Sequence, residues 1–160
     1  MILAFCLSIA LAANPFRVEV QSVSMTVDQT TEMVVTFVVP EGFHLYQDMM
    51  SVVPKLTDNL VFLDPVFPMG QLIVDPANPE QMREVFDAAV QVKIPIKSSK
   101  VGVYTTDVTV QYQGCKKTLC YMPKSETLPV TVQVVEPLLE ATEKEIDPLP
   151  FKRVQQYPRR

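Results

Sequence analysis

The sequence predicts an all-β fold, an antiparallel sandwich of short strands. Apolar residues alternate with polar ones along most of the chain, which is the period of strands with one buried face. Fourteen prolines and four glycines break these runs at intervals of about 8–12 residues, the spacing typical of sandwiches. The 160 residues, of which 48% are hydrophobic, are enough for one domain that buries about two-thirds of its unfolded surface. A net charge of −4 gives no reason to expect nucleic-acid binding.

Each expected strand is an apolar run that ends at a turn residue. The first alternates Phe16, Val18 and Val20 with charged residues. In order, the expected strands are 16–20, 23–27, 33–39, 43–53, 60–63, 91–96, 101–112 and 128–134. In the strand 91–96, Pro95 favours an edge position, because proline has no N–H to donate to a neighbouring strand.

The segment 74–90 carries conflicting signals. Asn78 has the side chain of a helix N-cap, Pro79 suits the first helical position, and Gln81 completes a capping box. Met82, Val85, Phe86 and Ala89 then follow at helical spacing. The local pattern therefore indicates a short helix.

The two ends of the chain differ from its middle. Residues 1–13 are apolar and carry Ala10-Leu-Ala12 near their end, the small-x-small pattern of a signal peptidase site. They lack the Lys or Arg that is usual near the start of a signal peptide. They are too few to span a bilayer, which needs about 20 apolar residues. We therefore expect a signal peptide (1–13, with Cys6), a domain (14–136), and a linker or C-terminal tail (137–160) rich in charge and proline. Export would leave Cys115 and Cys120 as the only cysteine pair, in an oxidising compartment.

The two cysteines lie in the segment YQGCKKTLCYMP, residues 112–123. Alternating runs enter and leave it, so it is predicted to form a β-hairpin with a cysteine at each shoulder. Facing positions near a hairpin end bring Cα atoms within the about 4.4–6.8 Å that a disulfide requires. Closing a loop of about six residues contributes only about 2 kcal/mol, against nearly 5 for about 100 residues, and Lys116 and Lys117 would favour a thiolate. The spacing alone leaves a redox role and a structural staple equally open.

The motif Tyr112-Gln-Gly-Cys115, followed by Cys120-Tyr-Met-Pro123, resembles the N-terminal periplasmic domain of the thiol:disulfide interchange reductase DsbD. The segments 40–46 (PEGFHLY), 84–86 and 92–96 also resemble that family. The resemblance runs from about residue 16 to 135. The loop between the cysteines has four residues, where the family pattern leads us to expect five.

The resemblance implies an immunoglobulin-like β-sandwich in the periplasm and a relay function. The dithiol would take electrons from a membrane electron-carrier domain or a thioredoxin-like donor. It would pass them to oxidised thioredoxin-fold proteins, such as disulfide isomerases or cytochrome c maturation factors, as part of a protein-disulfide reductase that needs no cofactor. Cys120 would form the mixed disulfide with the partner, and Cys115 would resolve it.

The resemblance also places side chains around the dithiol. Tyr46, Tyr112 and Tyr121 would form an apolar wall around the cysteines, and His44 would line the same pocket. Ordinary sandwich core is an equally good interpretation for Tyr46 and Tyr112, and a half-exposed strand position is the commoner one for a lone histidine.

A lid is the other feature that the resemblance implies. It would be a loop over residues 74–81, with Val74, Asp75, Pro76 and Asn78 among its residues, followed by an extended segment. We adopt this interpretation over the helix. The loop lacks the capping aromatic of the family, so that Ile73 or Val74 would have to substitute for it.

Two other classes of function fit parts of the sequence. Two cysteines and one distant histidine do not supply the three or four ligands of a zinc site, so no metal site is expected. Eight methionines raise the alternative of a Cu(I) carrier, although methionine more often fills gaps in a core. A non-catalytic immunoglobulin-like adhesion or chaperone module would keep the fold and an inert disulfide. Metal analysis tests the first alternative, and a reduction potential tests the second.

Overall fold

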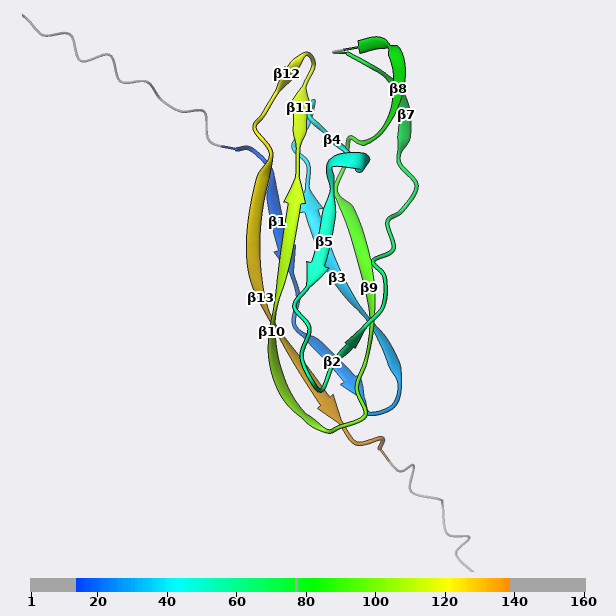
Figure 1. The fold of residues 1–160 in the computed structure, drawn as a ribbon, viewed down its shortest axis with the longest axis vertical. Coiled ribbons are helices and arrows are strands. Elements are labelled where there is room, and N and C mark those ends of the chain that lie inside the picture. The colour runs from blue at the N-terminus through cyan, green and yellow to red at the C-terminus, as the bar shows by residue number, and fades with distance from the viewer. Residues whose placement is uncertain (1–13, 77, 139–160) are drawn as a thin grey trace, which may run out of the picture.

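The computed structural model describes residues 14–76 and 78–138 as a sandwich of antiparallel sheets (Figure 1). The predicted immunoglobulin-like β-sandwich is confirmed. The expected signal peptide (1–13, with Cys6) and residues 139–160 of the expected tail lie outside the described residues. Among the described residues, no helix has the length and apolar character needed to cross a membrane.

Two four-stranded sheets form the body of the sandwich. The first has the order β1 (Arg17–Val20), β3 (Thr30–Val38), β9 (Val90–Lys97) and β6 (Val61–Phe62). The second has the order β2 (Val23–Thr26), β13 (Lys124–Val135), β10 (Gly102–Tyr112) and β5 (Ser51–Pro54). The pairs are antiparallel except β13 with β2. Every second side chain points inward, and these alternating residues of β3, β9, β10 and β13 form the main core.

A third sheet lies at one end of the sandwich, the upper end in Figure 1. Its five strands have the order β12 (Leu119–Cys120), β11 (Gly114–Lys116), β4 (His44–Tyr46), β8 (Asn78–Phe86) and β7 (Gln71–Asp75). This end sheet carries both cysteines of the motif.

The expected single strand 43–53 is wrong, because the structure divides it. β4 joins the end sheet and β5 joins the sandwich, and the short 3-10 helix η1 (Gln47–Met49) separates them. The Met50 N–H donates to the Gln47 carbonyl at 3.1 Å, which closes this turn. No glycine or proline marks the break, and only the polar pair Gln47-Asp48 interrupts the apolar run there.

The expected loop 74–81 is also wrong, and so is the helix that the local pattern indicates. The segment forms a β-hairpin of β7 and β8, in which Val74 pairs with Met82 and Asp75 with Asn78. The shift between these two pairs leaves residues 79–81 in a bulge, a position that tolerates Pro79. The Asn78 side chain accepts the Glu80 N–H at 3.4 Å. This is a turn contact that produces the same sequence signal as a helix cap. The extended structure expected after the loop is present.

The edge position expected from Pro95 is wrong as well. Strand β9 lies between β3 and β6. The Pro95 carbonyl accepts the Leu63 N–H at 2.9 Å, on the β6 side. Both backbone groups of a strand residue point to the same side. The missing N–H therefore faces the side where β9 pairs with the two-residue β6 and, through an isolated bridge, with Val66.

Candidate functional site

The cysteine hairpin connects the two strands of the longest strand pair of the sandwich. β10 and β13 pair from Gly102 with Val134 to Tyr112 with Lys124. The chain between them forms β11 and β12, where Cys115 and Cys120 face each other in register. Their sulfurs are bonded at 2.02 Å, and their Cα atoms are 4.0 Å apart. Lys117 turns the hairpin with a φ of 53°.

The two cysteines have different surroundings. Cys115 is 0% exposed because β11 lies between β12 and β4. Cys120 is exposed on β12, which is an edge strand of the end sheet. Leu119 and Met122 beside it are 65% and 84% exposed. An approaching protein therefore meets Cys120 and apolar side chains first.

One face of the end sheet gathers the side chains around Cys115. In register, Cys115 lies opposite His44, and Tyr46 lies opposite Val85. Because side chains alternate along a strand, these residues share one face. Tyr46, Val85 and Cys115 form a small buried cluster with Ile73 packed against it. We call these four residues the cysteine cluster.

Arg83 covers the outer side of this cluster. Its guanidinium carbon lies 3.7 Å from the centroid of the Tyr46 ring, which is a cation–π contact. Its nitrogens pair with Asp48 and, at 3.6 Å, with the buried Asp75. The Tyr46 hydroxyl donates to the same Asp75 carboxylate at 3.4 Å. Burial and the nearby Asp75 charge raise the pKa of Tyr46, so its hydroxyl keeps its proton and serves as a donor.

His44 is half-buried beside this group. Its ring meets the Tyr46 ring edge to face, with centroids 5.1 Å apart. Burial lowers the pKa of His44, and Arg83 lowers it further, while Asp75 and Asp87 act in the opposite direction. The imidazole is therefore biased toward its neutral form.

Of the other two expected pocket tyrosines, Tyr112 lies in the main core and the half-buried Tyr121 packs against it. The buried Tyr112 meets Phe16 and Phe37 edge to face, and its hydroxyl donates to Glu126 at 2.9 Å. Burial raises its pKa. Tyr121 packs at 6.1 Å from Phe16. These rings lie beneath the cysteine hairpin, and neither belongs to the cysteine cluster.

The hairpin approaches these rings so closely that only glycine fits at its base. A Cβ at position 114 would lie 2.2 Å from the Phe16 ring and 2.6 Å from the His44 carbonyl oxygen. Gly114 therefore lets β11 pass between the aromatic core and β4.

The residues expected as a lid have different positions. Asp75 is buried under Arg83, whereas Val74, Pro76 and Asn78 are exposed. Of the two residues expected to replace a capping aromatic, Ile73 is the one in the cysteine cluster. Sequence reasoning missed the contributions of Arg83 and Val85, because their shared face becomes visible only when 78–86 is taken as a strand.

The two lysines of the hairpin are exposed. The Lys116 ammonium lies 5.0 Å from the centroid of the Phe43 ring. Alternation along β11 places it on the face opposite to Cys115. We expected Lys116 and Lys117 to favour a thiolate, and this placement of Lys116 gives that expectation no support at Cys115.

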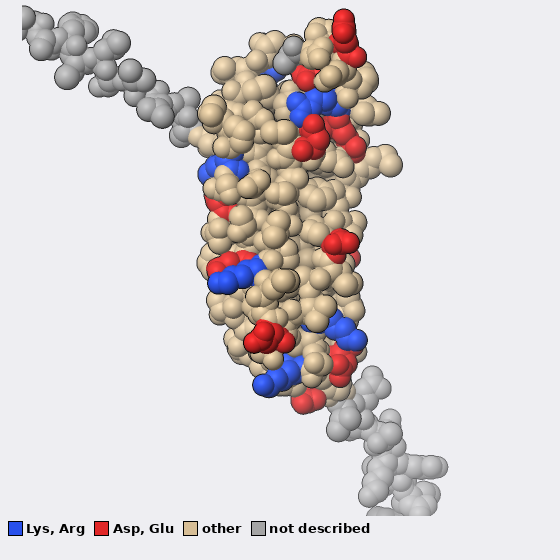
Figure 2. All heavy atoms as spheres, in the orientation of Figure 1, with Lys and Arg blue, Asp and Glu red and all other residues tan. Residues whose placement is uncertain are grey.

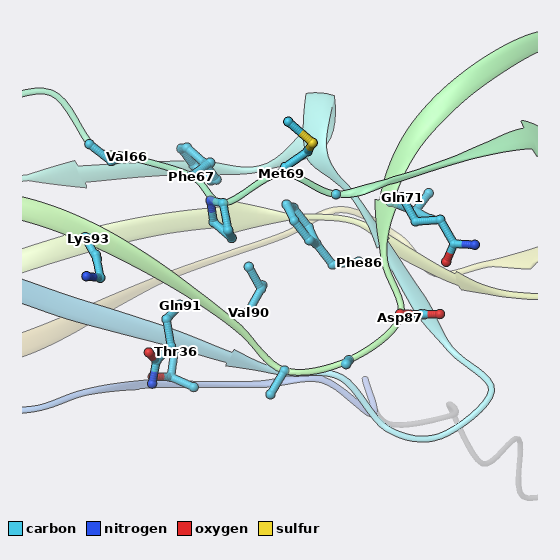
Figure 3. Close-up of a pocket in the computed structure, with 15 residues that line it drawn as sticks. Thr36, Val66, Phe67, Met69, Gln71, Phe86, Asp87, Val90, Gln91 and Lys93 are labelled. Carbon is cyan, nitrogen blue, oxygen red and sulfur yellow. The ribbon is translucent and has the colours of Figure 1, made fainter.

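A separate hollow of about 710 Å³ lies beside the end sheet, between residues 66–71 and 85–93 (Figure 3). The rings of Phe67 and Phe86 line it, and its charged groups are Asp87 and Lys93. It contains neither cysteine and shares only Val85 with the cysteine cluster. Within residues 14–76 and 78–138, no three or more His, Cys, Asp or Glu side chains gather as metal ligands would.

Charged side chains are scattered over the face of the sandwich that Figure 2 shows. They form a mixed acidic and basic group at the upper end, over the β7–β8 hairpin. The ion pairs of Arg83 with Asp48 and Asp75 belong to this end.

Comparisons with known proteins relate the chain to one family. A family model described as thiol:disulfide interchange protein DsbD, N-terminal, matches residues 13–132. The reduced form of the DsbD N-terminal domain from Neisseria meningitidis is 23% identical, with a TM-score of 0.52 over 67% of this chain and 82% of that one. A second similar structure is the complex between the DsbD N-terminal and PilB N-terminal domains of the same organism. The matched chain is 22% identical, with a TM-score of 0.52 over 71% of this chain and 80% of that one. No curated protein matches the chain.

Proposed function

Because the chain belongs to the family of DsbD N-terminal domains, we propose that it is a periplasmic electron relay whose redox centre is the Cys115–Cys120 pair. Thiol:disulfide interchange is the activity of that family. The finer proposal is the direction of the relay. The reduced pair receives electrons from a membrane electron-carrier domain or a thioredoxin-like donor and passes them to oxidised thioredoxin-fold proteins.

The unequal exposure of the two cysteines carries this proposal. In the acceptor step, the Cys120 thiolate attacks one sulfur of the partner's disulfide, and the partner's other sulfur leaves as a thiolate. The buried Cys115 then attacks the Cys120 sulfur of the mixed disulfide. The Cys115–Cys120 bond forms, the bond to the partner breaks, and the partner departs with two reduced sulfurs.

The position of the pair at the end of the sandwich supports the same role. A disulfide that closes a loop of about six residues stabilises the folded state by only about 2 kcal/mol. The pair also lies in the short end sheet, outside the long β10–β13 ladder. Opening the bond therefore leaves the main core intact, which suits a bond that is made and broken repeatedly.

The partners and the domain limits are part of the proposal. A structure of a relative from Neisseria meningitidis with a PilB N-terminal domain supports protein partners that dock on this kind of domain. We propose thioredoxin-fold partners of the disulfide isomerase or cytochrome c maturation type. Residues 14–136 would form the exchange domain, preceded by a signal peptide over 1–13 and followed by a linker or tail over 137–160.

Trapping of mixed disulfides tests the assigned roles. Cys115→Ser removes the resolving sulfur, so periplasmic expression of this variant should accumulate disulfide-linked adducts through Cys120. Cys120→Ser is the matched control and should accumulate far fewer, because its remaining cysteine is buried. Mass spectrometry of the adducts names the partners. Equal trapping by both variants would contradict the roles, and no adducts from either would favour an inert adhesion module.

The reduction potential separates the relay from a structural bond. The protein without the expected signal peptide and its Cys6 is equilibrated against glutathione or dithiothreitol buffers, and the free thiols are alkylated and counted by mass. We expect a potential within the range of periplasmic carriers. A potential well below about −300 mV marks a structural disulfide and would end the relay proposal.

A further inference from the structure

His44 and Cys115 face each other across two neighbouring strands. They are direct partners in the β4–β11 register. Directly opposite residues of an antiparallel pair have Cβ atoms about 4.5–5.5 Å apart and point to the same face. The sequence contains one histidine, and the fold places it beside the buried sulfur.

The buried sulfur needs a proton acceptor in the resolving step. A thiol attacks a disulfide only as its thiolate, and an unperturbed cysteine has a pKa of about 8.5. Burial in an apolar cluster disfavours the charged form further. Cys115 is 0% exposed among Tyr46, Val85 and Ile73. A neighbouring group that takes the proton of this thiol would therefore speed its attack on the mixed disulfide.

The surroundings of His44 suit a proton acceptor. Its Nε2 atom is buried, and no group of the described residues forms a hydrogen bond with it. Burial lowers the pKa of His44, which keeps the imidazole neutral and able to accept at neutral pH. The charged groups that face it are Asp75 of β7, Arg83 of β8 and Asp87 after β8. The two carboxylates stabilise an imidazolium once it forms.

The proton also has a route to solvent. A hollow of about 500 Å³ borders His44, between the turn before β4 and the β7–β8 hairpin. Its polar lining includes Glu41, Gln71 and Asp87. A proton held on the imidazole can leave through this hollow after the sulfur chemistry is complete.

We propose that His44 is the general base that deprotonates Cys115 when the mixed disulfide is resolved. The proposal rests on the proposed relay function. The proton moves from the Cys115 sulfur to an imidazole nitrogen, directly or through one water. The resulting thiolate attacks the Cys120 sulfur, the Cys115–Cys120 bond forms, and the partner's sulfur leaves as a thiolate. The imidazolium then returns its proton to that thiolate or to water. In the reverse direction, the imidazolium protonates Cys115 as the internal disulfide opens.

Stopped-flow oxidation by dipyridyl disulfide of the reduced protein, without the expected signal peptide and its Cys6, tests the proposal. Attack by Cys120 releases one pyridinethione in a first phase, and attack by Cys115 releases a second. We expect His44→Gln to slow the second phase on the order of 100-fold at neutral pH, within the range of general-base effects. The first phase should keep its rate. In the variant the second phase should rise steeply with pH, as hydroxide replaces the base, whereas the wild-type rate should change little above the pKa of His44.

The two phases in His44→Gln and in the wild type distinguish a general base, a structural role and a failed relay. A second phase with the wild-type rate and pH profile in His44→Gln would overturn the general base and leave the relay intact. A slowing that is the same at every pH would assign His44 a structural role and also overturn it. Absence of the first phase in the wild type would refute the relay itself. His44→Phe, which fills the same space without a base, should slow the second phase as His44→Gln does, and its unfolding midpoint reports whether β4 still pairs with β11.

Discussion

The strands that carry the sandwich core pair over longer stretches than the strands around the cysteines. β10 and β13 pair along eleven positions, and the core between the sandwich sheets is apolar and almost fully buried. In the end sheet, β11 pairs with β12, and β4 with β8, along two positions each. Three buried residues, Tyr46, Val85 and Cys115, make up its own cluster. The comparison indicates that the sandwich supplies stability, while the end sheet can open locally at a lower free-energy cost.

The largest expected effect comes from a cavity in the sandwich. Phe37 is fully buried and lies 5.7 Å from the Tyr112 ring. Phe37→Ala should lower the free energy of unfolding by about 3–5 kcal/mol, as measured by urea denaturation. The alkylation rate of Cys120 in the folded, reduced protein should not change. The exposed Val103→Ala on β10 is the control, with an expected change within about 0.5 kcal/mol. A large rise in Cys120 alkylation would show that the two regions are not separable.

Reduction of the disulfide should have a smaller effect. Because the loop is short, the reduced protein should lose only about 2 kcal/mol of unfolding free energy. Parallel urea titrations of the oxidised and reduced protein measure this difference. A loss above about 4 kcal/mol would exceed the loop-entropy value and would identify the bond as a structural staple of the whole domain.

Removal of Arg83 should destabilise the end sheet and leave the sandwich unchanged. Arg83→Met keeps the aliphatic length but removes the contacts with the Tyr46 ring and the buried Asp75. We expect a loss of about 1.5 kcal/mol, the lower end of the range for a hydrogen bond to a charged group, and faster alkylation of Cys115. Lys55→Met is the matched control, because Lys55 pairs with Asp107 at 3.6 Å on the exposed surface and such pairs contribute about 0–1 kcal/mol. An unchanged Cys115 rate in Arg83→Met would mean that Arg83 does not hold the hairpin over the cysteine.

The smallest expected effect is a pH dependence of stability. Burial lowers the pKa of His44 in the folded state, so the unfolded chain binds a proton more readily. Stability should therefore fall as the pH drops through the unfolded-state pKa of about 6.5. His44→Gln should lose that part of the slope, which urea midpoints at several pH values would show. Equal slopes in both proteins would mean that His44 is as solvated in the folded chain as in the unfolded one.

The two regions also differ in how far the sequence predicts them. The sandwich strands follow from alternation, since residues such as Val92, Ile94 and Ile96 have their partners on one face along the whole strand. The family motif identifies the cysteines, and their register follows from the hairpin. The end sheet depends on tertiary pairing of short strands. Neither Asn78 nor Pro79 reveals locally that residues 79–81 form a bulge, and the segment 43–53 has no glycine or proline at the turn of η1.

The role of individual side chains was harder to predict for the same reason. Tyr46 and Tyr112 look alike in sequence, yet one packs on Cys115 and the other on Phe16 and Phe37. Which of the two lies beside the sulfur depends on which sheet its strand joins. Arg83 becomes a candidate only when β8 is known to pair with β4.

Strand β13 links the two ends of the domain. It begins beside the cysteine hairpin and ends at the opposite end of the molecule (Figure 1). Twelve residues of strand at about 3.4 Å each span about 40 Å. A tether attached after residue 138 would hold the domain at the end opposite to the cysteine hairpin. The exposed Cys120 would then lie at the end of the sandwich that is farthest from the tether. The distance from the attachment point to Cys120 is then set by the length of the sandwich. The attachment point also sets the direction from which Cys120 meets a partner.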